Sequence, residues 1–230
     1  MKVILSGGGD PPQSILTDKY YRNLILESSS RGGADILFVP DAVIPDWSIN
    51  QAVEWLRRDT FEDLTVEIGY LAQIRQQPEP RSIFLMGGNT FRLLDAFLAW
   101  DTGPFLRRYA NEGIVYGCSA GSIILGKSIR TAFLGQEPDA NEVGLDRFEG
   151  LDLLCGLNIV PHFVEADLES VADLVDAELS GCLCIAEDGG ALWDGSDLIN
   201  IGASELLLCL PGSRQVIVPG STISGSSLQP

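Results

Sequence analysis

Ser119 and His162 are the two side chains of this sequence that could together perform nucleophilic chemistry. Ser119 lies in the run Gly117-Cys118-Ser119-Ala120-Gly121, which has the G-x-S-x-G spacing of a nucleophile elbow. His162 is the only histidine of the chain. If the serine is a nucleophile with a histidine as its general base, only His162 can be that base.

The chain around Ser119 has the strand–turn–helix pattern that an elbow requires. Residues 113–116 (Gly-Ile-Val-Tyr) predict a short buried strand, and residues 122–125 (Ser-Ile-Ile-Leu) predict the start of a helix. Small residues between them allow a tight turn from which a serine hydroxyl projects.

Glycine clusters follow three of the expected strands, at residues 7–9, 87–88 and 117–121. Ligands of open α/β sheets bind at the carboxyl ends of strands, so we expect the three clusters to meet at one cleft. There the N–H of Gly88, paired with that of Ala120, can face a developing oxyanion. We take Asn89 as a further candidate for substrate contact. Neither G-x-G-x-x-G nor a P-loop lysine accompanies these glycines, which argues against a nucleotide site.

Strand and helix patterns alternate along the chain, which predicts an α/β fold. This would be a three-layer sandwich with a mostly parallel sheet and right-handed crossovers. The expected strands are Lys2–Ser6, Asp35–Val39, Ser82–Met86, Gly113–Gly117 and Cys182–Ala186. The expected helices are Thr17–Ser30, Ser48–Arg58, Leu64–Gln76, Thr90–Ala99, Phe105–Asn111 and Leu168–Leu179. Residues 191–202 and 215–219 predict short strands with tight turns, as in a hairpin at the sheet edge.

The 230 residues predict one catalytic domain, residues 1–219, followed by a Ser- and Gly-rich mobile tail, residues 220–230. A formal net charge of −17 disfavours nucleic acid and anionic membranes as partners. Five unpatterned cysteines and a single histidine form no zinc set, and we expect neither metal nor cofactor. Met1–Gly9 is too short and glycine-rich for a signal peptide. We therefore expect a cytoplasmic protein with reduced thiols, acting as a monomer or a homodimer.

Four segments together resemble the peptidase E (aspartyl dipeptidase) family of serine peptidases, which is related to the cyanophycinases. They are Gly87-Gly88-Asn89-Thr90-Phe91-x-Leu93-Leu94, Gly117-x-Ser119-Ala120-Gly121, Ile129-Arg130-Thr131 and Pro161-His162-Phe163. Their order and approximate spacing match over about residues 1–210. The resemblance implies a fold like that of the class I glutamine amidotransferases (flavodoxin-like), with a serine in place of their cysteine. It also implies hydrolysis of short acidic peptides.

The same resemblance suggests the acid of a triad. Glu187 is similar to a family glutamate that follows the strand after the histidine, and Asp139 is similar to an acidic position upstream. We prefer Glu187 as the residue that orients His162 and keep Asp139 as a second, supporting acid. Asp188 and Glu142 are the neighbouring alternatives.

One departure from the family concerns specificity. Aspartyl dipeptidases carry a longer stretch after the histidine, with arginines that hold the substrate's aspartate. Here residues 163–173 are shorter, acidic and without arginine, so strict Asp-Xaa specificity is not expected. Arg92 and Arg130 are the cations nearest the predicted cleft in sequence.

Two other classes of function stay open. The order Ser119–Asp139–His162 also suits an esterase of the α/β-hydrolase type, although the histidine of those enzymes normally lies much later. Alternatively, the chain is a catalytically silent binding protein of amidotransferase-like fold. In that case the elbow is only a tight turn and His162 is a core residue. Labelling with a fluorophosphonate probe distinguishes an activated serine from a silent one.

Overall fold

Two β-sheets form the framework of the protein in a computed structural model. The structure describes residues 1–230 except 11, 44–48, 58–59, 178–180 and 229–230. The larger sheet has eight described strands in the order β12 (Thr222–Ser224), β9 (Asp197–Asn200), β8 (Gly190–Trp193), β1 (Lys2–Ser6), β5 (Ile114–Cys118), β4 (Ser82–Leu85), β2 (Ile36–Val39) and β3 (Val66–Ile68).

The strands from β1 to β3 in this order are parallel, whereas β8, β9 and β12 are added antiparallel at the other edge. The predicted largely parallel sheet is therefore confirmed. Residues 191–202 do form a hairpin at the sheet edge, since β8 pairs with β9, but residues 215–217 lie in a strand of the second sheet and do not pair with them.

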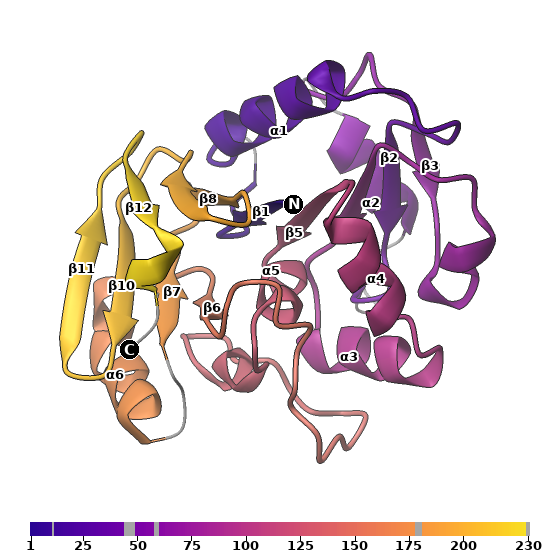
Figure 1. Cartoon of the computed structure of the whole chain (residues 1–230). Coiled ribbons are helices and arrows are strands. Elements are labelled where there is room, and N and C mark those ends of the chain that lie inside the picture. Colours follow the sequence, from indigo (N-terminus) through magenta and orange to yellow (C-terminus); the bar gives the residue numbers. More distant parts are fainter. Residues whose placement is uncertain (11, 44–48, 58–59, 178–180, 229–230) are drawn as a thin grey trace.

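Helices cover both faces of the larger sheet because alternate residues of its central strands are apolar on each side. Side chains such as Ile4, Phe84 and Tyr116 pack against α1 (Ile15–Glu27) and α2 (Ile49–Arg57). Val3, Leu85 and their equivalents pack against α3 (Thr90–Ala99), α4 (Gly103–Ala110) and α5 (Ala120–Leu125). Figure 1 shows α1 and α3 on opposite sides of this sheet. None of the described helices is long and apolar enough to cross a membrane.

The smaller sheet is not predicted from the sequence. Its described order is β11 (Ser213–Ile217), β10 (Leu206–Leu210), β7 (Cys182–Cys184) and β6 (Asn158–Val160). Helix α6 (Leu168–Ala177) packs on one face through Val171 and Val175. The segment expected at Cys182–Ala186 thus pairs with β6 and β10 rather than with the strands of the parallel sheet.

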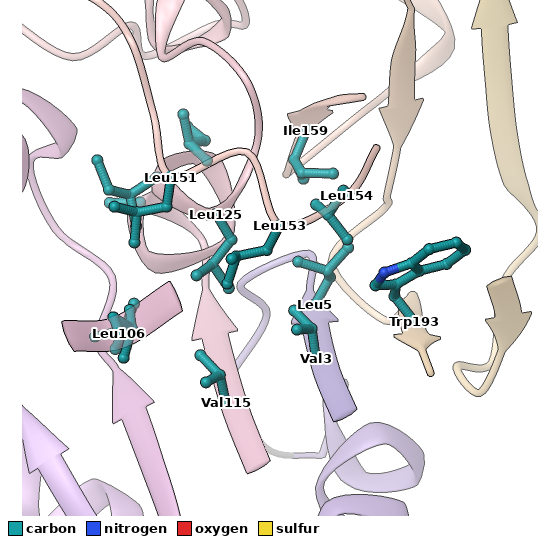
Figure 2. Close-up of a cluster of buried hydrophobic side chains, with 14 of the residues drawn as sticks. Val3, Leu5, Leu106, Val115, Leu125, Leu151, Leu153, Leu154, Ile159 and Trp193 are labelled. Atoms are coloured by element: carbon teal, nitrogen blue, oxygen red, sulfur yellow. The ribbon is translucent and has the colours of Figure 1, made fainter. Parts of the chain in front are cut away.

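A segment without regular helix or strand, residues 134–157, joins the two sheets. The backbone N–H groups of Gly150 and Leu151 donate to Lys127 O, just after α5, at 2.9 Å and to Ile124 O, within α5, at 2.8 Å. Figure 2 shows Leu153 and Leu154 of this segment beside Leu5, in a buried cluster that also contains Ile159 and Trp193. This burial of apolar side chains fixes the segment over the carboxyl end of the larger sheet.

The helix predicted at Leu64–Gln76 is wrong. Residues 66–68 form the edge strand β3, and a 3₁₀ helix covers Leu71–Gln76. Val66 and Ile68 are β-branched and favour a strand, and the Gly69 N–H donates to Phe38 O at 2.9 Å. The other expected helices lie within a few residues of those observed, although Ser48, Arg58 and Leu179 fall outside the described residues.

The chain's C-terminal segment also differs from the expected mobile tail. Residues 222–224 form β12, which pairs with β9, and a 3₁₀ helix covers Gly225–Ser227. Leu228 is 2% exposed and belongs to the main apolar cluster. The apolar side chains of Ile223 and Leu228, which pack in this cluster, therefore order the segment despite its Ser- and Gly-rich composition.

We predict that Leu228→Ala lowers the free energy of unfolding by about 2–5 kcal/mol, the usual range for truncating a buried leucine. Urea denaturation followed by circular dichroism measures it. The control is Ser227→Ala, an exposed neighbour expected to change stability by about 0.5 kcal/mol at most. Equal effects of the two substitutions would mean that this segment contributes as little as a mobile tail.

Candidate active site

Ser119 lies at the sharp turn between β5 and α5. Its backbone has φ 51° and ψ −112°, a conformation that non-glycine residues seldom adopt. Its N–H donates to Ser6 O of the neighbouring strand β1 at 3.3 Å. The predicted elbow is therefore present, with a strained serine that the surrounding backbone holds in place.

Gly117 and Gly121 allow α5 to approach the sheet this closely. A Cβ atom on Gly121 would lie 2.1 Å from Leu85 O, and one on Gly117 would lie 2.4 Å from Gly121 O. Both distances are far below contact between non-bonded atoms. The glycines of the G-x-S-x-G run thus serve helix–sheet packing, and the packing aims the serine.

His162 follows β6 and Pro161 in a second left-handed turn, with φ 52°. Its N–H donates to Gly7 O at 3.0 Å, which fixes the residue against the end of β1. The Nε2 atom of its ring lies 2.8 Å from Ser119 Oγ. This is a hydrogen-bond distance, so the two residues singled out by the sequence lie together as a nucleophile and a general base would.

Glu187 is the carboxylate beside the other ring nitrogen. Its Oε1 lies 3.5 Å from His162 Nδ1, and its Oε2 accepts a hydrogen bond of 2.8 Å from Gln13 Nε2. The sequence does not predict this contact of Gln13, because a single glutamine after two prolines belongs to no motif. Asp188, the neighbouring alternative, is absent from the described lining of the cleft.

Gly8 packs directly on the Ser119–His162 pair. It has φ +97°, and a Cβ atom there would lie 2.5 Å from His162 Cε1 and 2.9 Å from Ser119 Cβ. The glycine cluster at the end of β1 therefore has a steric role at this site, since no side chain fits between it and the imidazole.

Gly88 and Ala120 carry backbone N–H groups that have no acceptor in the described part of the chain. Ala120 is the first residue of α5, where an N–H lacks an intrahelical partner. Gly88 has φ +135°, and a Cβ atom on it would lie 2.1 Å from Ala42 O. Two unpaired N–H groups beside a serine are the arrangement that an oxyanion hole requires.

Asn89 and Asp139 hold the loop that carries Gly88. Asn89 Oδ1 accepts from the N–H of Arg92, and its Nδ2 donates to Ala140 O at 2.9 Å. Both polar groups of this buried amide are thus used inside the protein. We therefore assign Asn89 a positioning role instead of the expected substrate contact.

The carboxylate of Asp139 accepts from Thr90 N at 2.8 Å, at the first turn of α3. Burial raises the pKa of this carboxyl above its ordinary value. Asp139 lines the cleft together with His162, but the carboxylate beside the imidazole Nδ1 is that of Glu187.

The two arginines nearest the cleft in sequence point to other partners. Arg92 Nη2 lies 2.9 Å from Glu142 Oε2, and the Arg130 guanidinium lies 4.9 Å from the centre of the Phe148 ring. Glu142, the other alternative acid, is therefore an ion-pair partner of Arg92. Neither arginine is among the described residues that line the cleft.

Two cavities of about 420 Å³ and 540 Å³ meet at the serine. Gly88, Ser119, Glu137 and His162 line both. A ligand can therefore extend on either side of Ser119. Glu137, in the segment after the Arg130–Phe133 turn, is a cleft residue that no sequence pattern indicates. Over the described residues, no group of His, Cys, Asp and Glu side chains is arranged to hold a metal ion.

Comparison with known proteins gives a consistent result. The model of peptidase family S51 matches residues 3–201. Peptidase E from Shewanella denitrificans is 27% identical over 175 residues, which are 70% of this chain and 73% of that protein.

Two solved structures have a similar fold. One is a peptidase from an acI-B1 Actinobacterium, with a TM-score of 0.68 and 16% identity, covering 97% of this chain and 96% of the other. A candidate peptidase E from Listeria monocytogenes EGD-e has a TM-score of 0.65 and 20% identity, covering 88% and 98%. At these identities the likeness establishes the fold, and the α/β, amidotransferase-like architecture expected from the sequence is confirmed.

We predict that Gly8→Ala slows labelling of Ser119 by a fluorophosphonate probe on the order of a hundredfold, because the new methyl group displaces the imidazole. The matched control is Gly32→Ala. Gly32 has a similar φ of +92° but nothing within 4 Å of its Cβ position, so it carries the backbone strain without the clash. Equal labelling rates for the two variants would contradict the steric role of Gly8.

Proposed function

The chain belongs to peptidase family S51 and is a serine-type peptidase, and from this premise we propose that it hydrolyses short peptides with Ser119 as nucleophile and His162 as general base. The observation that carries the proposal is the 2.8 Å distance between Ser119 Oγ and His162 Nε2. Glu187 is the proposed third member of the triad.

In the proposed reaction, His162 Nε2 takes the proton of the Ser119 hydroxyl as Oγ attacks the scissile carbonyl carbon. The N–H groups of Gly88 and Ala120 stabilise the negative oxygen of the tetrahedral intermediate. The imidazolium then gives its proton to the leaving amine. A water molecule activated by the same imidazole releases the acyl group from the serine.

Glu187 would hold the imidazole with its proton on Nδ1 and stabilise the imidazolium that forms during attack. Gln13 would in turn orient Glu187 through the other carboxylate oxygen. The 3.5 Å separation of Glu187 Oε1 and His162 Nδ1 is longer than an ideal hydrogen bond. Such distances commonly shorten when substrate binds.

The two alternative functions are less well supported. An esterase with the order Ser119–Asp139–His162 would need Asp139 on the imidazole, whereas the Asp139 carboxylate bonds to Thr90 N. A silent binding protein would have no reason to keep a strained serine, an adjacent imidazole and two unpaired N–H groups at one place.

We propose a cytoplasmic location because none of the five cysteines forms a disulfide bond. They are Cys118, Cys155, Cys182, Cys184 and Cys209. Burial raises the pKa of the Cys118 thiol to about 12, so this neighbour of the nucleophile is itself unreactive.

The proposal is tested by incubating the protein with a panel of dipeptides and tripeptides and measuring hydrolysis as the release of free amines. Ser119→Ala should abolish turnover and leave the fold intact. Glu187→Gln should lower kcat by about a hundredfold, because it removes the charge that stabilises the imidazolium. The matched control Asp188→Asn should change kcat only about twofold, within the ordinary scatter of a neutral substitution. Substantial turnover by Ser119→Ala, or equal losses in the two acid variants, would overturn the triad.

A further inference from the structure

We propose that the cleft selects peptides that carry an ammonium or guanidinium group next to the scissile bond, and that Glu137 is the specificity-determining residue. This inference rests on the proposed function, because it concerns the substrate of the same site. It is the opposite of a preference for acidic peptides.

The charged side chains that line the two cavities have one sign. Asp10 lines the smaller cavity, Asp139 and Glu187 line the larger one, and Glu137 lines both. No lysine or arginine lines either cavity within the described part of the chain. The carboxylates alone would not define a binding site. The site is defined by the cavities and by the serine at their junction.

The nearest arginines do not offset this charge. Arg92 is paired with Glu142, and the guanidinium of Arg130 packs over Phe148. A substrate carboxylate in the cleft would therefore meet several negative charges without a guanidinium to receive it. Acidic peptides are disfavoured by repulsion, and the protein's net charge of −17 adds to that field.

Glu137 differs from Glu187 and Asp139 because its carboxylate has no partner among the described residues. Glu187 is engaged by Gln13 and His162, and Asp139 accepts from Thr90 N. Glu137 is exposed and has no hydrogen bond or ion pair with another described residue. A substrate cation is thus the partner that this carboxylate can still accept.

Thr131 provides a second, independent observation at the larger cavity. This residue is 2% exposed and lines the cavity, and its hydroxyl oxygen has no hydrogen-bond partner among the described residues. Buried hydroxyls are normally paired. An ammonium group has three N–H donors and no acceptor, so it can serve both a carboxylate and a hydroxyl oxygen. A carboxylate ligand can serve only the hydroxyl.

The experiment compares matched dipeptides with lysine, norleucine or aspartate as the first residue, each with a free and an acetylated amino terminus. Acetylation distinguishes the α-ammonium group from the lysine side chain as the source of the cation. Calorimetry on Ser119→Ala measures binding without turnover, and hydrolysis by the wild-type protein is measured in parallel. The double variant Ser119→Ala, Glu137→Gln is compared with Ser119→Ala, Glu67→Gln, which removes an equal charge from the exposed edge strand β3.

We expect the lysine peptide to bind about tenfold more tightly than the aspartate peptide at low salt, with the ratio falling as salt screens the charges. Glu137→Gln should bring the ratio near unity, and Glu67→Gln should leave it unchanged. Equal or tighter binding of the aspartate peptide, equal effects of the two substitutions, or no binding of any peptide would overturn the inference. A charge preference in binding without hydrolysis by the wild-type protein would contradict only the proposed function.

Discussion

The site depends on a seam of backbone hydrogen bonds between the end of β1 and the smaller sheet. Gly7 N donates to Gly189 O at 3.3 Å, Gly9 N donates to Glu187 O at 3.2 Å, and His162 N donates to Gly7 O at 3.0 Å. Ser119 follows a strand of the larger sheet, whereas His162 and Glu187 follow strands of the smaller one. These bonds therefore set the relative positions of all three side chains. Glycine is required at the seam because backbone has to contact backbone.

A buried polar network joins the larger sheet to α1, on the face of the sheet that this helix covers. Asp18 of α1, 2% exposed, accepts hydrogen bonds from Ser14 Oγ at 2.6 Å and from Tyr116 OH at 2.8 Å. Burial raises the pKa of its carboxyl. Tyr116 belongs to β5, the strand that leads to Ser119. Helix α1 is thereby linked to the strand that carries this serine.

Much of this arrangement is predictable from the sequence, for local reasons. Strands β1, β2, β4 and β5 are continuous apolar runs, and the elbow is a short pattern with its own sterics. His162 can be identified because the chain has no other histidine. The smaller sheet is less predictable. Its strands have three to five residues, and β6 and β7 carry no alternation that would distinguish them from loops. Tertiary packing brings Gln13 to Glu187 and Glu137 to the cleft, and the sequence around each residue gives no indication of either contact.

One measurement tests directly whether His162 accepts the serine proton at Nε2 while its Nδ1–H faces Glu187. With a single histidine, nitrogen-15 NMR of the labelled protein gives one pair of ring resonances, free of overlap. For the neutral imidazole, we expect the tautomer with the proton on Nδ1, and an Nε2 resonance that shifts when Ser119 is replaced by alanine. A neutral imidazole protonated on Nε2 would donate to the serine instead of accepting from it. That result would contradict the assignment of His162 as the general base.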